Sequence, residues 1–205
     1  MADVMKFLID NSPAMLGRKQ MAICGEPQHP LVAGQLLTPL TGYRNAGCIY
    51  GVDNGCFKRF DSSKFFRILH RDRHLASNCK FVCCPDKVGD CWETMRLFVK
   101  YRKLLRGWPI AFVVQDGQPV ELIPWQGIDA IFIGGTDALK NSKLAVSVLE
   151  LANAMGKHTH VGRVNTPERW LRFRKLAKTC DGSGVSRYDH MLQDILKFAL
   201  KWELL

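Results

Sequence analysis

Residues 179–187 read T-C-D-G-S-G-V-S-R, a short apolar run that ends at Asp181 and is followed by glycine and serine. A carboxylate at the carboxyl end of a late strand is where an α/β barrel keeps a catalytic acid or nucleophile. Asp-Gly is also ordinary turn chemistry, and an aspartate can cap the helix that follows it. The stretch alone leaves both interpretations open, so the choice depends on whether the pattern recurs along the chain.

A short apolar strand, a polar or glycine-rich end and then a helix recur about seven times in this order. Continuous apolar strands separated by helices predict a parallel sheet that is covered on both faces. So many consecutive units favour closure, and we predict an α/β fold, a compact TIM-like (β/α) barrel with about seven or eight parallel strands in a single domain over 1–205. The predicted strands are 4–9, 48–52, 80–84, 110–114, 130–133, 158–161 and a short strand that ends before Asp181.

Helices are predicted between these strands, with the clearest amphipathic pattern at 90–105. Single helices are also predicted over 137–155 and over 188–202. The segment 25–47 is rich in Pro, Gly and Thr, so we predict a long loop with little regular structure and find no evident eighth strand. Loops of that length in compact domains are often functional or mobile.

The chain carries 29 Lys and Arg against 19 Asp and Glu, a formal net charge of +10, which suits a polyanionic partner. The excess is clustered, and a run of charge is often only a solvated helix face, although such faces normally mix both signs. We therefore predict nucleic acid as the partner. The clusters are Lys58, Arg59, Lys64, Arg67, Arg71 and Arg73, and then Arg163, Arg169, Arg172, Arg174, Lys175 and Lys178.

No stretch approaches the roughly 20 apolar residues of a membrane helix, and the amino terminus lacks the layout of a secretory signal. We expect a cytoplasmic protein without membrane association. The eight cysteines form no C-x-x-C pair, so they predict no zinc framework. His158 and His160 would share one face of a strand, as metal ligands sometimes do, but no matching carboxylate motif lies nearby. We expect no metal.

In a barrel the carboxyl ends of the strands share one rim, so the residues at those ends should form a common mouth. Paired carboxylates at a pocket bind metal, act as acid and base, or supply a nucleophile beside an acid/base. The residues expected at this mouth are Asp10, Asp53, Asp86, Gln115, Gly134, Gly135, Gly162 and Asp181.

Six motifs at these strand ends, taken in order, resemble the tRNA-guanine transglycosylase superfamily, including its relatives that insert deazaguanines into DNA. The resemblance covers about residues 48–187. The motifs are V-D-N-G-C-F at 52–57, V-C-C-P-D at 82–86, V-V-Q-D-G at 113–117, I-F-I-G-G-T at 131–136, H-V-G-R-V-N-T-P-E-R-W at 160–170 and C-D-G-S-G-V-S-R at 180–187.

The resemblance implies that Asp181 is the nucleophile and Asp53 the general acid/base of a DNA base transglycosylase, which exchanges guanine for a 7-deazaguanine such as preQ0. A flipped-out base would enter the pocket while basic residues hold its phosphates. We accordingly predict substrate binding by Asp10, Asn54, Asp86, Gln115, Gly134, Gly135, Gly162 and Arg187. The predicted contacts to the nucleic-acid backbone are Lys58, Arg59, Arg163, Arg169, Arg172 and Lys175.

The sequence also departs from this family. The C-x-C-x-x-C and His zinc module of the tRNA enzymes is missing after Asp181, so no zinc is expected and DNA is favoured over tRNA. Three alternatives stay open. They are a DNA glycosylase that hydrolyses the bond and leaves an abasic site, a non-catalytic barrel that binds nucleic acid, and a metal-dependent hydrolase that uses His158, His160 and an aspartate.

Overall fold

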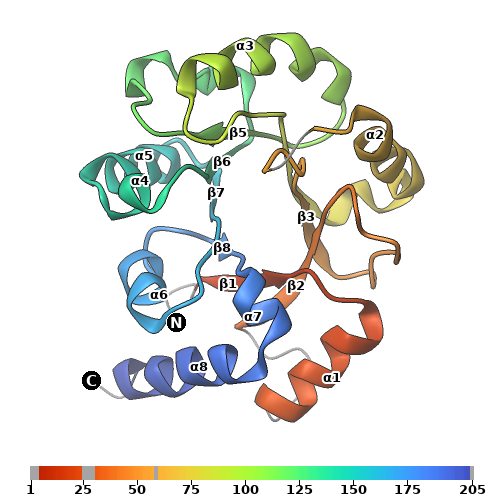
Figure 1. The fold of residues 1–205 in the computed structure, drawn as a ribbon, viewed down its shortest axis with the longest axis vertical. Coiled ribbons are helices and arrows are strands. Elements are labelled where there is room, and N and C mark those ends of the chain that lie inside the picture. The colour runs from red at the N-terminus through yellow and green to blue at the C-terminus, as the bar shows by residue number, and fades with distance from the viewer. Residues whose placement is uncertain (1–4, 25–30, 58–59, 204–205) are drawn as a thin grey trace.

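The computed structural model describes residues 5–24, 31–57 and 60–203, and its centre is a closed barrel of eight parallel strands. Each strand pairs with the next one along the chain, and β8 closes the barrel against β1 (Figure 1). This confirms the predicted fold class. The strands are β1 (Lys6–Ile9), β2 (Val32–Leu37), β3 (Ile49–Val52), β4 (Cys79–Cys83), β5 (Ile110–Val114), β6 (Ala130–Ile133), β7 (His158–Val161) and β8 (Thr179–Cys180).

Helices surround the barrel, and most of them lie in the crossovers that join one parallel strand to the next (Figure 1). The α-helices are α1 (Pro13–Cys24), α2 (Ser62–Arg71), α3 (Cys91–Tyr101), α4 (Asp137–Asn141), α5 (Lys143–Ala154), α6 (Pro167–Phe173), α7 (Ser183–Arg187) and α8 (Asp189–Glu203). Short 3₁₀ turns are η1 (Arg73–Asn78), η2 (Arg102–Leu105), η3 (Val120–Leu122) and η4 (Trp125–Gly127). Among the described helices, none is long and apolar enough to cross a membrane.

The prediction of one long loop over 25–47 was wrong, because β2 lies inside this segment. With the seven predicted strands, β2 completes the eight strands of the barrel. Residues 25–30 of that loop lie outside the described part of the chain. The strand contains Gly34, and a Cβ at this position would lie only 1.9 Å from the carbonyl oxygen of Ile49 on β3. Glycine normally weakens a strand, but here it lets two backbones approach closely. The Pro, Gly and Thr content of 25–47 therefore indicated a loop, although Gly34 is needed for the close packing of strand β2 against β3.

Replacing Gly34 by alanine should destabilise the barrel by about 3 kcal/mol, since the new methyl group must push β2 away from β3. Urea unfolding followed by circular dichroism measures this difference. Gly42→Ala is the matched control, because no atom lies within 4 Å of a Cβ built at Gly42. Equal stability of the Gly34→Ala and Gly42→Ala proteins would contradict the role given to Gly34.

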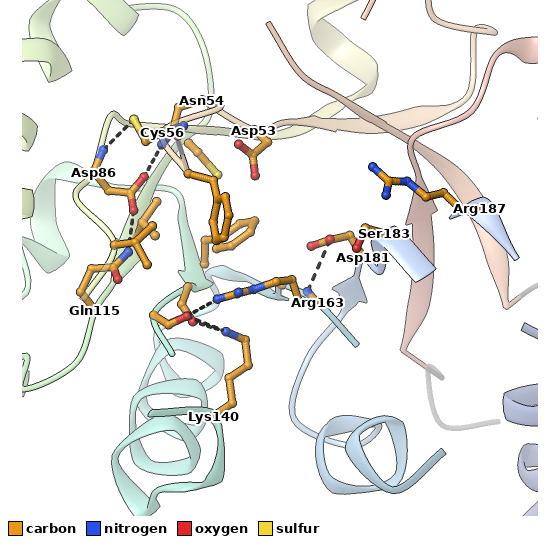
Figure 2. Close-up of a pocket in the computed structure, with 18 residues that line it drawn as sticks. Asp53, Asn54, Cys56, Asp86, Gln115, Lys140, Arg163, Asp181, Ser183 and Arg187 are labelled. Carbon is orange, nitrogen blue, oxygen red and sulfur yellow. Dashed lines mark hydrogen bonds between the residues drawn. The ribbon is translucent and has the colours of Figure 1, made fainter. Parts of the chain in front are cut away.

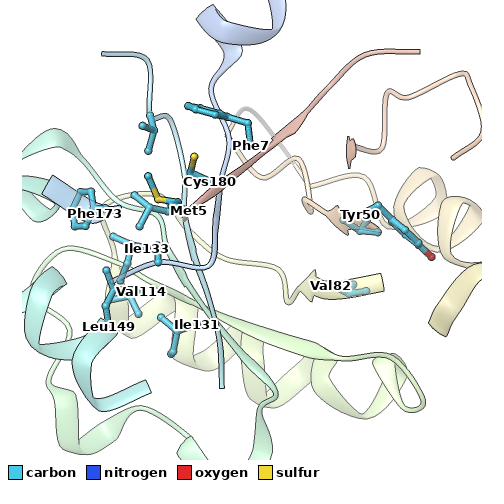
Figure 3. Packing of buried hydrophobic residues seen from close by; sticks show 14 of the residues in the cluster. Met5, Phe7, Tyr50, Val82, Val114, Ile131, Ile133, Leu149, Phe173 and Cys180 are labelled. Atoms are coloured by element: carbon cyan, nitrogen blue, oxygen red, sulfur yellow. The ribbon is translucent and has the colours of Figure 1, made fainter. Parts of the chain in front are cut away.

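Two layers of buried side chains stabilise the fold. Outside the barrel, residues such as Tyr50, Ile131 and Phe173 pack between strands and helices (Figure 3). Inside the barrel a smaller cluster fills the centre, and the ring of Phe81 occupies the space that Gly51 leaves on β3. This inner cluster contains Leu8, Leu36, Phe81, Cys83, Ala111, Val113, Ala130 and Phe132.

Several helix predictions needed correction at their ends. The glycine and serine after Asp181 form the short helix α7, whose N-cap is Gly182, so Asp181 is not a helix cap. The predicted helix over 137–155 is two helices, since Ser142 caps a new start at α5 with its side-chain oxygen. The amphipathic helix predicted at 90–105 ends as the 3₁₀ turn η2 after Tyr101.

Candidate active site

One end of the barrel holds a cavity of about 440 Å³ at the carboxyl ends of the strands (Figure 2). This is the common mouth that the sequence predicted. Its volume lies within the usual range for small-molecule sites. The predicted site residues that line it are Asp53, Asn54, Asp86, Gln115, Gly134, Gly135, Gly162, Arg163, Asp181 and Arg187.

Asp86 is held by two amide side chains and forms a fixed wall of the cavity. Asn54 Nδ2 donates to Asp86 Oδ1 at 2.7 Å, and Gln115 Nε2 donates to Asp86 Oδ2 at 2.5 Å. The other end of the Gln115 amide accepts a hydrogen bond from the backbone of Gly89 at 2.9 Å. Burial raises the pKa of Asp86 to about 6, although hydrogen bonds from Asn54 and Cys56 favour its ionised form. Asp86 and Gln115 are thus bonded to each other, which weakens the prediction that both read a substrate edge.

Asp53 follows β3 and presents a carboxyl group that is partly protonated at neutral pH. Its Oδ1 accepts a hydrogen bond of 2.6 Å from the backbone of Gly55, whose φ of 72° closes the turn. Burial raises the pKa of Asp53 to about 7. The Gly55 N–H opposes this rise, whereas the negative charges of Asp181, Asp86 and Asp10 add to it.

Asp181 follows β8, and its carboxylate accepts two hydrogen bonds from β7 and the loop after it. His160 Nε2 lies 3.0 Å from Asp181 Oδ1, and the backbone N–H of Arg163 lies 3.4 Å from Oδ2. The Asp181 side chain is only 14% exposed. Figure 2 shows the carboxyl groups of Asp53 and Asp181 directed into the same space. The cavity therefore contains one carboxyl with a raised pKa, that of Asp53, and a second, that of Asp181, which accepts hydrogen bonds.

Arg163 has a left-handed backbone with φ of 59°, which is strained for a residue other than glycine. Its guanidinium donates to the carbonyl oxygen of Gly135 and lies 5.5 Å from the ring centre of Phe57. The same conformation directs its N–H toward Asp181. Strain of this kind is concentrated at functional sites, where surrounding contacts maintain it.

Lys140 is a buried cation that the sequence analysis missed, because a lysine inside a predicted helix is normally exposed. It lies on α4, and its Nζ donates to the carbonyl oxygens of Gly134 and Gly135, the latter at 3.1 Å. Burial lowers the pKa of Lys140 to about 8, assisted by the nearby charges of Arg163 and Arg169. The two glycine carbonyls are therefore bonded to protein cations.

A second cavity of about 830 Å³ adjoins the first. Asp10 lines it and accepts a hydrogen bond of 2.5 Å from the hydroxyl of Tyr43. Five residues line both cavities and lie where the two cavities meet. These shared residues are Asp53, Phe57, Asp181, Ser183 and Arg187.

Three of the predicted nucleic-acid contacts, Arg163, Arg169 and Arg172, bond to other groups of the described chain. Arg172 donates to the carbonyl oxygens that end α4, those of residues 140, 141 and 142, at 2.9–3.1 Å. Arg169 forms an ion pair of 3.0 Å with Asp137, while Lys175 is exposed. Lys58 and Arg59 lie outside the described residues. The nucleic-acid partner stays a prediction.

The two histidines of β7 do not form a metal site. Both hydrogen-bond to the hydroxyl of Thr179, each at 2.8 Å. Across residues 5–24, 31–57 and 60–203, no group of three or more His, Cys, Asp and Glu side chains could hold a metal ion. The metal-dependent hydrolase built on His158 and His160 therefore has no ligand set in the described chain.

No protein-family model matches the chain, and no curated protein matches it. Among solved structures, L-talarate dehydratase from Polaromonas sp. JS666, complexed with Mg and L-glucarate, has a TM-score of 0.47 and 12% identity over 89% of this chain and 51% of its own. A mandelate racemase/muconate lactonizing enzyme from the same organism has a TM-score of 0.46 and 12% identity over 89% of this chain and 53% of its own. The chain spans about half the length of these structures, and so distant a likeness assigns it no activity.

The predicted membership of the tRNA-guanine transglycosylase superfamily is corrected, since neither a model of that family nor any curated protein matches the chain, and the solved structures named above are not members of it. The predicted base exchange in DNA is withdrawn with it, as are the DNA glycosylase and the non-catalytic nucleic-acid-binding barrel. Short motifs at strand ends are weak guides to a family. Any barrel of this type places polar and glycine residues there.

Proposed function

We propose that this chain is an enzyme of general acid–base chemistry that acts on a small anionic substrate. Asp53 is the proton donor and Asp181 the proton acceptor. The observation that carries the proposal is the placement of these two carboxyls at one mouth in different environments. Titratable pairs whose surroundings separate their protonation states are the usual acid and base of an active site.

The environments differ in a way that fits these roles. Asp53 has a pKa of about 7, so an appreciable fraction holds a proton at neutral pH. Asp181 accepts hydrogen bonds from His160 and from the backbone N–H of Arg163, and these two bonds hold its carboxyl in place at the mouth. A group whose pKa lies near the working pH is the most effective proton donor.

An anionic substrate is supported by the cations around the same cavity. Lys140 and Arg163 line it, although each already donates to a backbone carbonyl. Arg187 lines both cavities, and its guanidinium has no hydrogen bond or ion pair with the described part of the chain. Its guanidinium points from α7 toward Asp53 and Asp181 (Figure 2). A carboxylate or phosphate is the group that such a guanidinium binds best.

The test uses a small-molecule extract of cells, which requires no prior choice of substrate. The wild-type protein, Asp53→Asn, Asp181→Asn and the exposed-site control Asp194→Asn are each incubated with the extract, and untargeted mass spectrometry follows the compounds. We expect an anionic compound to be consumed by the wild type and the control, but not by the two site variants. Equal consumption by Asp181→Asn, or no change with the wild type, would count against the proposal.

A further inference from the structure

Three polar side chains form a continuous hydrogen-bonded row beneath Asp181, inside the barrel. His158 Nε2 lies 2.8 Å from Thr179 Oγ1, and the same hydroxyl lies 2.8 Å from His160 Nδ1. His160 Nε2 then lies 3.0 Å from Asp181 Oδ1. His158 is the first residue of β7, so the row begins near the end of the barrel opposite the mouth.

The chemistry of each group fixes the direction of these bonds. An ionised carboxylate only accepts, so His160 Nε2 must carry the proton and donate to Asp181. In a neutral imidazole the other nitrogen then accepts, so the Thr179 hydroxyl donates to His160 Nδ1. The hydroxyl has one proton, and its oxygen must therefore accept from His158 Nε2. All the donors point toward Asp181.

The surroundings keep both imidazoles neutral, as this arrangement requires. The ring of His160 lies between aromatic neighbours, with centroids 4.6 Å from both Phe81 and Phe132. Burial is the main cause that lowers the pKa of His158 to about 3, and the neighbouring His160, Lys178 and Lys80 act in the same direction. Burial also lowers the pKa of His160, against the opposing effect of Asp181.

We propose that His158, Thr179 and His160 form a proton relay that orients Asp181 and connects it to solvent at the opposite end of the barrel. Asp181 exchanges its proton with solvent through this row, and the steps below, run in reverse, return Asp181 to its ionised form. The proposal rests on the proposed function for its biological purpose, because it makes these residues positioning groups for the base of that site. The relay itself is a property of the hydrogen bonds and can be measured without a substrate.

In the transfer, one proton enters the row at His158 and one proton leaves it to Asp181. A solvent proton binds His158 Nδ1, and His158 Nε2 gives its proton to the Thr179 oxygen. The hydroxyl proton of Thr179 moves to His160 Nδ1, and His160 Nε2 gives its proton to Asp181 Oδ1. Each imidazole starts and ends neutral, but both change tautomer, and the direction of every hydrogen bond is reversed.

The relay predicts that protonation of Asp181 changes the tautomers of both histidines together. We expect ¹⁵N NMR to show protonated Nε2 in His158 and His160 at pH 7. Both should switch to protonated Nδ1 over the pH range in which the ¹³C signal of the Asp181 carboxyl titrates. In Thr179→Val the His158 switch should be lost, and Thr179→Ser should retain it because serine keeps the hydroxyl.

Charged groups from other elements also face the row. Asp181 is faced by Asp53 after β3, Lys140 on α4, Arg163 after β7 and Arg187 on α7, while Lys80 on β4 and Lys178 lie near His158. Repeating the titration in Asp53→Asn removes the titrating carboxyl that shares both cavities with Asp181, and it should leave the coupled switch intact. In Asp181→Asn both histidines should keep one tautomer at every pH.

Three results would overturn the relay. The histidines could keep their tautomers while Asp181 titrates, His160 could become doubly protonated instead, or the His158 switch could persist in Thr179→Val. Thermal unfolding of each variant verifies that it is folded. If the wild type lacks the switch while Asp181→Asn is inactive, the relay alone is removed. If the wild type shows the coupled switch while Asp181→Asn is active, the proposed function alone is removed.

Discussion

Asp181→Asn should lower kcat/KM by about 100- to 10,000-fold, the range that general acid–base groups contribute. Asparagine keeps the size of the side chain and can still accept a hydrogen bond from His160, but it cannot take up a proton. The barrel should therefore fold normally. Steady-state kinetics on the compound found in the extract, with circular dichroism on the same sample, measures both quantities.

Asp194→Asn is the matched control for this substitution, because Asp194 is an exposed aspartate on α8 outside both cavities. Its kcat/KM should equal that of the wild type. A drop in the control as large as that in Asp181→Asn would show that the loss does not come from the site. Full activity in Asp181→Asn would remove Asp181 from the mechanism.

Asp53→Asn should remove the alkaline limb of the pH–rate profile and lower kcat by about 100-fold or more. Asp53 acts in its protonated form, so wild-type activity should fall as the pH rises through the pKa of about 7. Asparagine does not ionise, and the remaining activity should be flat in that range. Rates measured from pH 5 to 9 check this. A wild-type profile without a decline near pH 7, or an unchanged decline in the variant, would contradict the role of Asp53.

The same substitution should make the protein more stable at alkaline pH. The folded-state pKa of Asp53 is raised from the ordinary 3.8 to about 7, so between these values the folded protein keeps a proton that the unfolded chain releases. The contribution of Asp53 to the stability of the wild type therefore falls as the pH rises from about 4 to about 7. Asp53→Asn should have the higher melting temperature at pH 8, and the difference should shrink toward pH 4. Thermal unfolding at both pH values measures it.

Much of the fold could be predicted because its signals are local. Each of the seven predicted strands overlaps a strand of the barrel, since a run of apolar residues followed by a polar or glycine end is visible in the sequence. The eighth strand could not be found in this way. Its Gly34 and its Gly-rich and Pro-rich flanks indicate a loop, and only the approach to Ile49 on β3 explains the glycine.

The mouth was also predicted in outline, because parallel strands in a barrel must end on one rim. The hydrogen bonds within the mouth were not predicted. Lys140 lies in a helix where the sequence gives no sign of burial, and its partners are carbonyls of the preceding loop. The pairing of Asp86 with Gln115 joins residues 29 positions apart. Such contacts depend on where two elements meet, which periodicity does not encode.

The sequence by itself determined the parallel barrel and placed Asp53 and Asp181 at its mouth, since alternating strands and helices leave few other architectures. Only the tertiary structure decided which groups surround these two carboxyls. The pKa of Asp53 depends on its burial and on charges from other strands. The row from His158 through Thr179 and His160 to Asp181 exists only because β7 and β8 lie side by side. The H-T-H spacing at 158–160 places two histidines on one face of a strand, as in some metal sites, but the barrel directs both rings to a threonine on the adjacent strand.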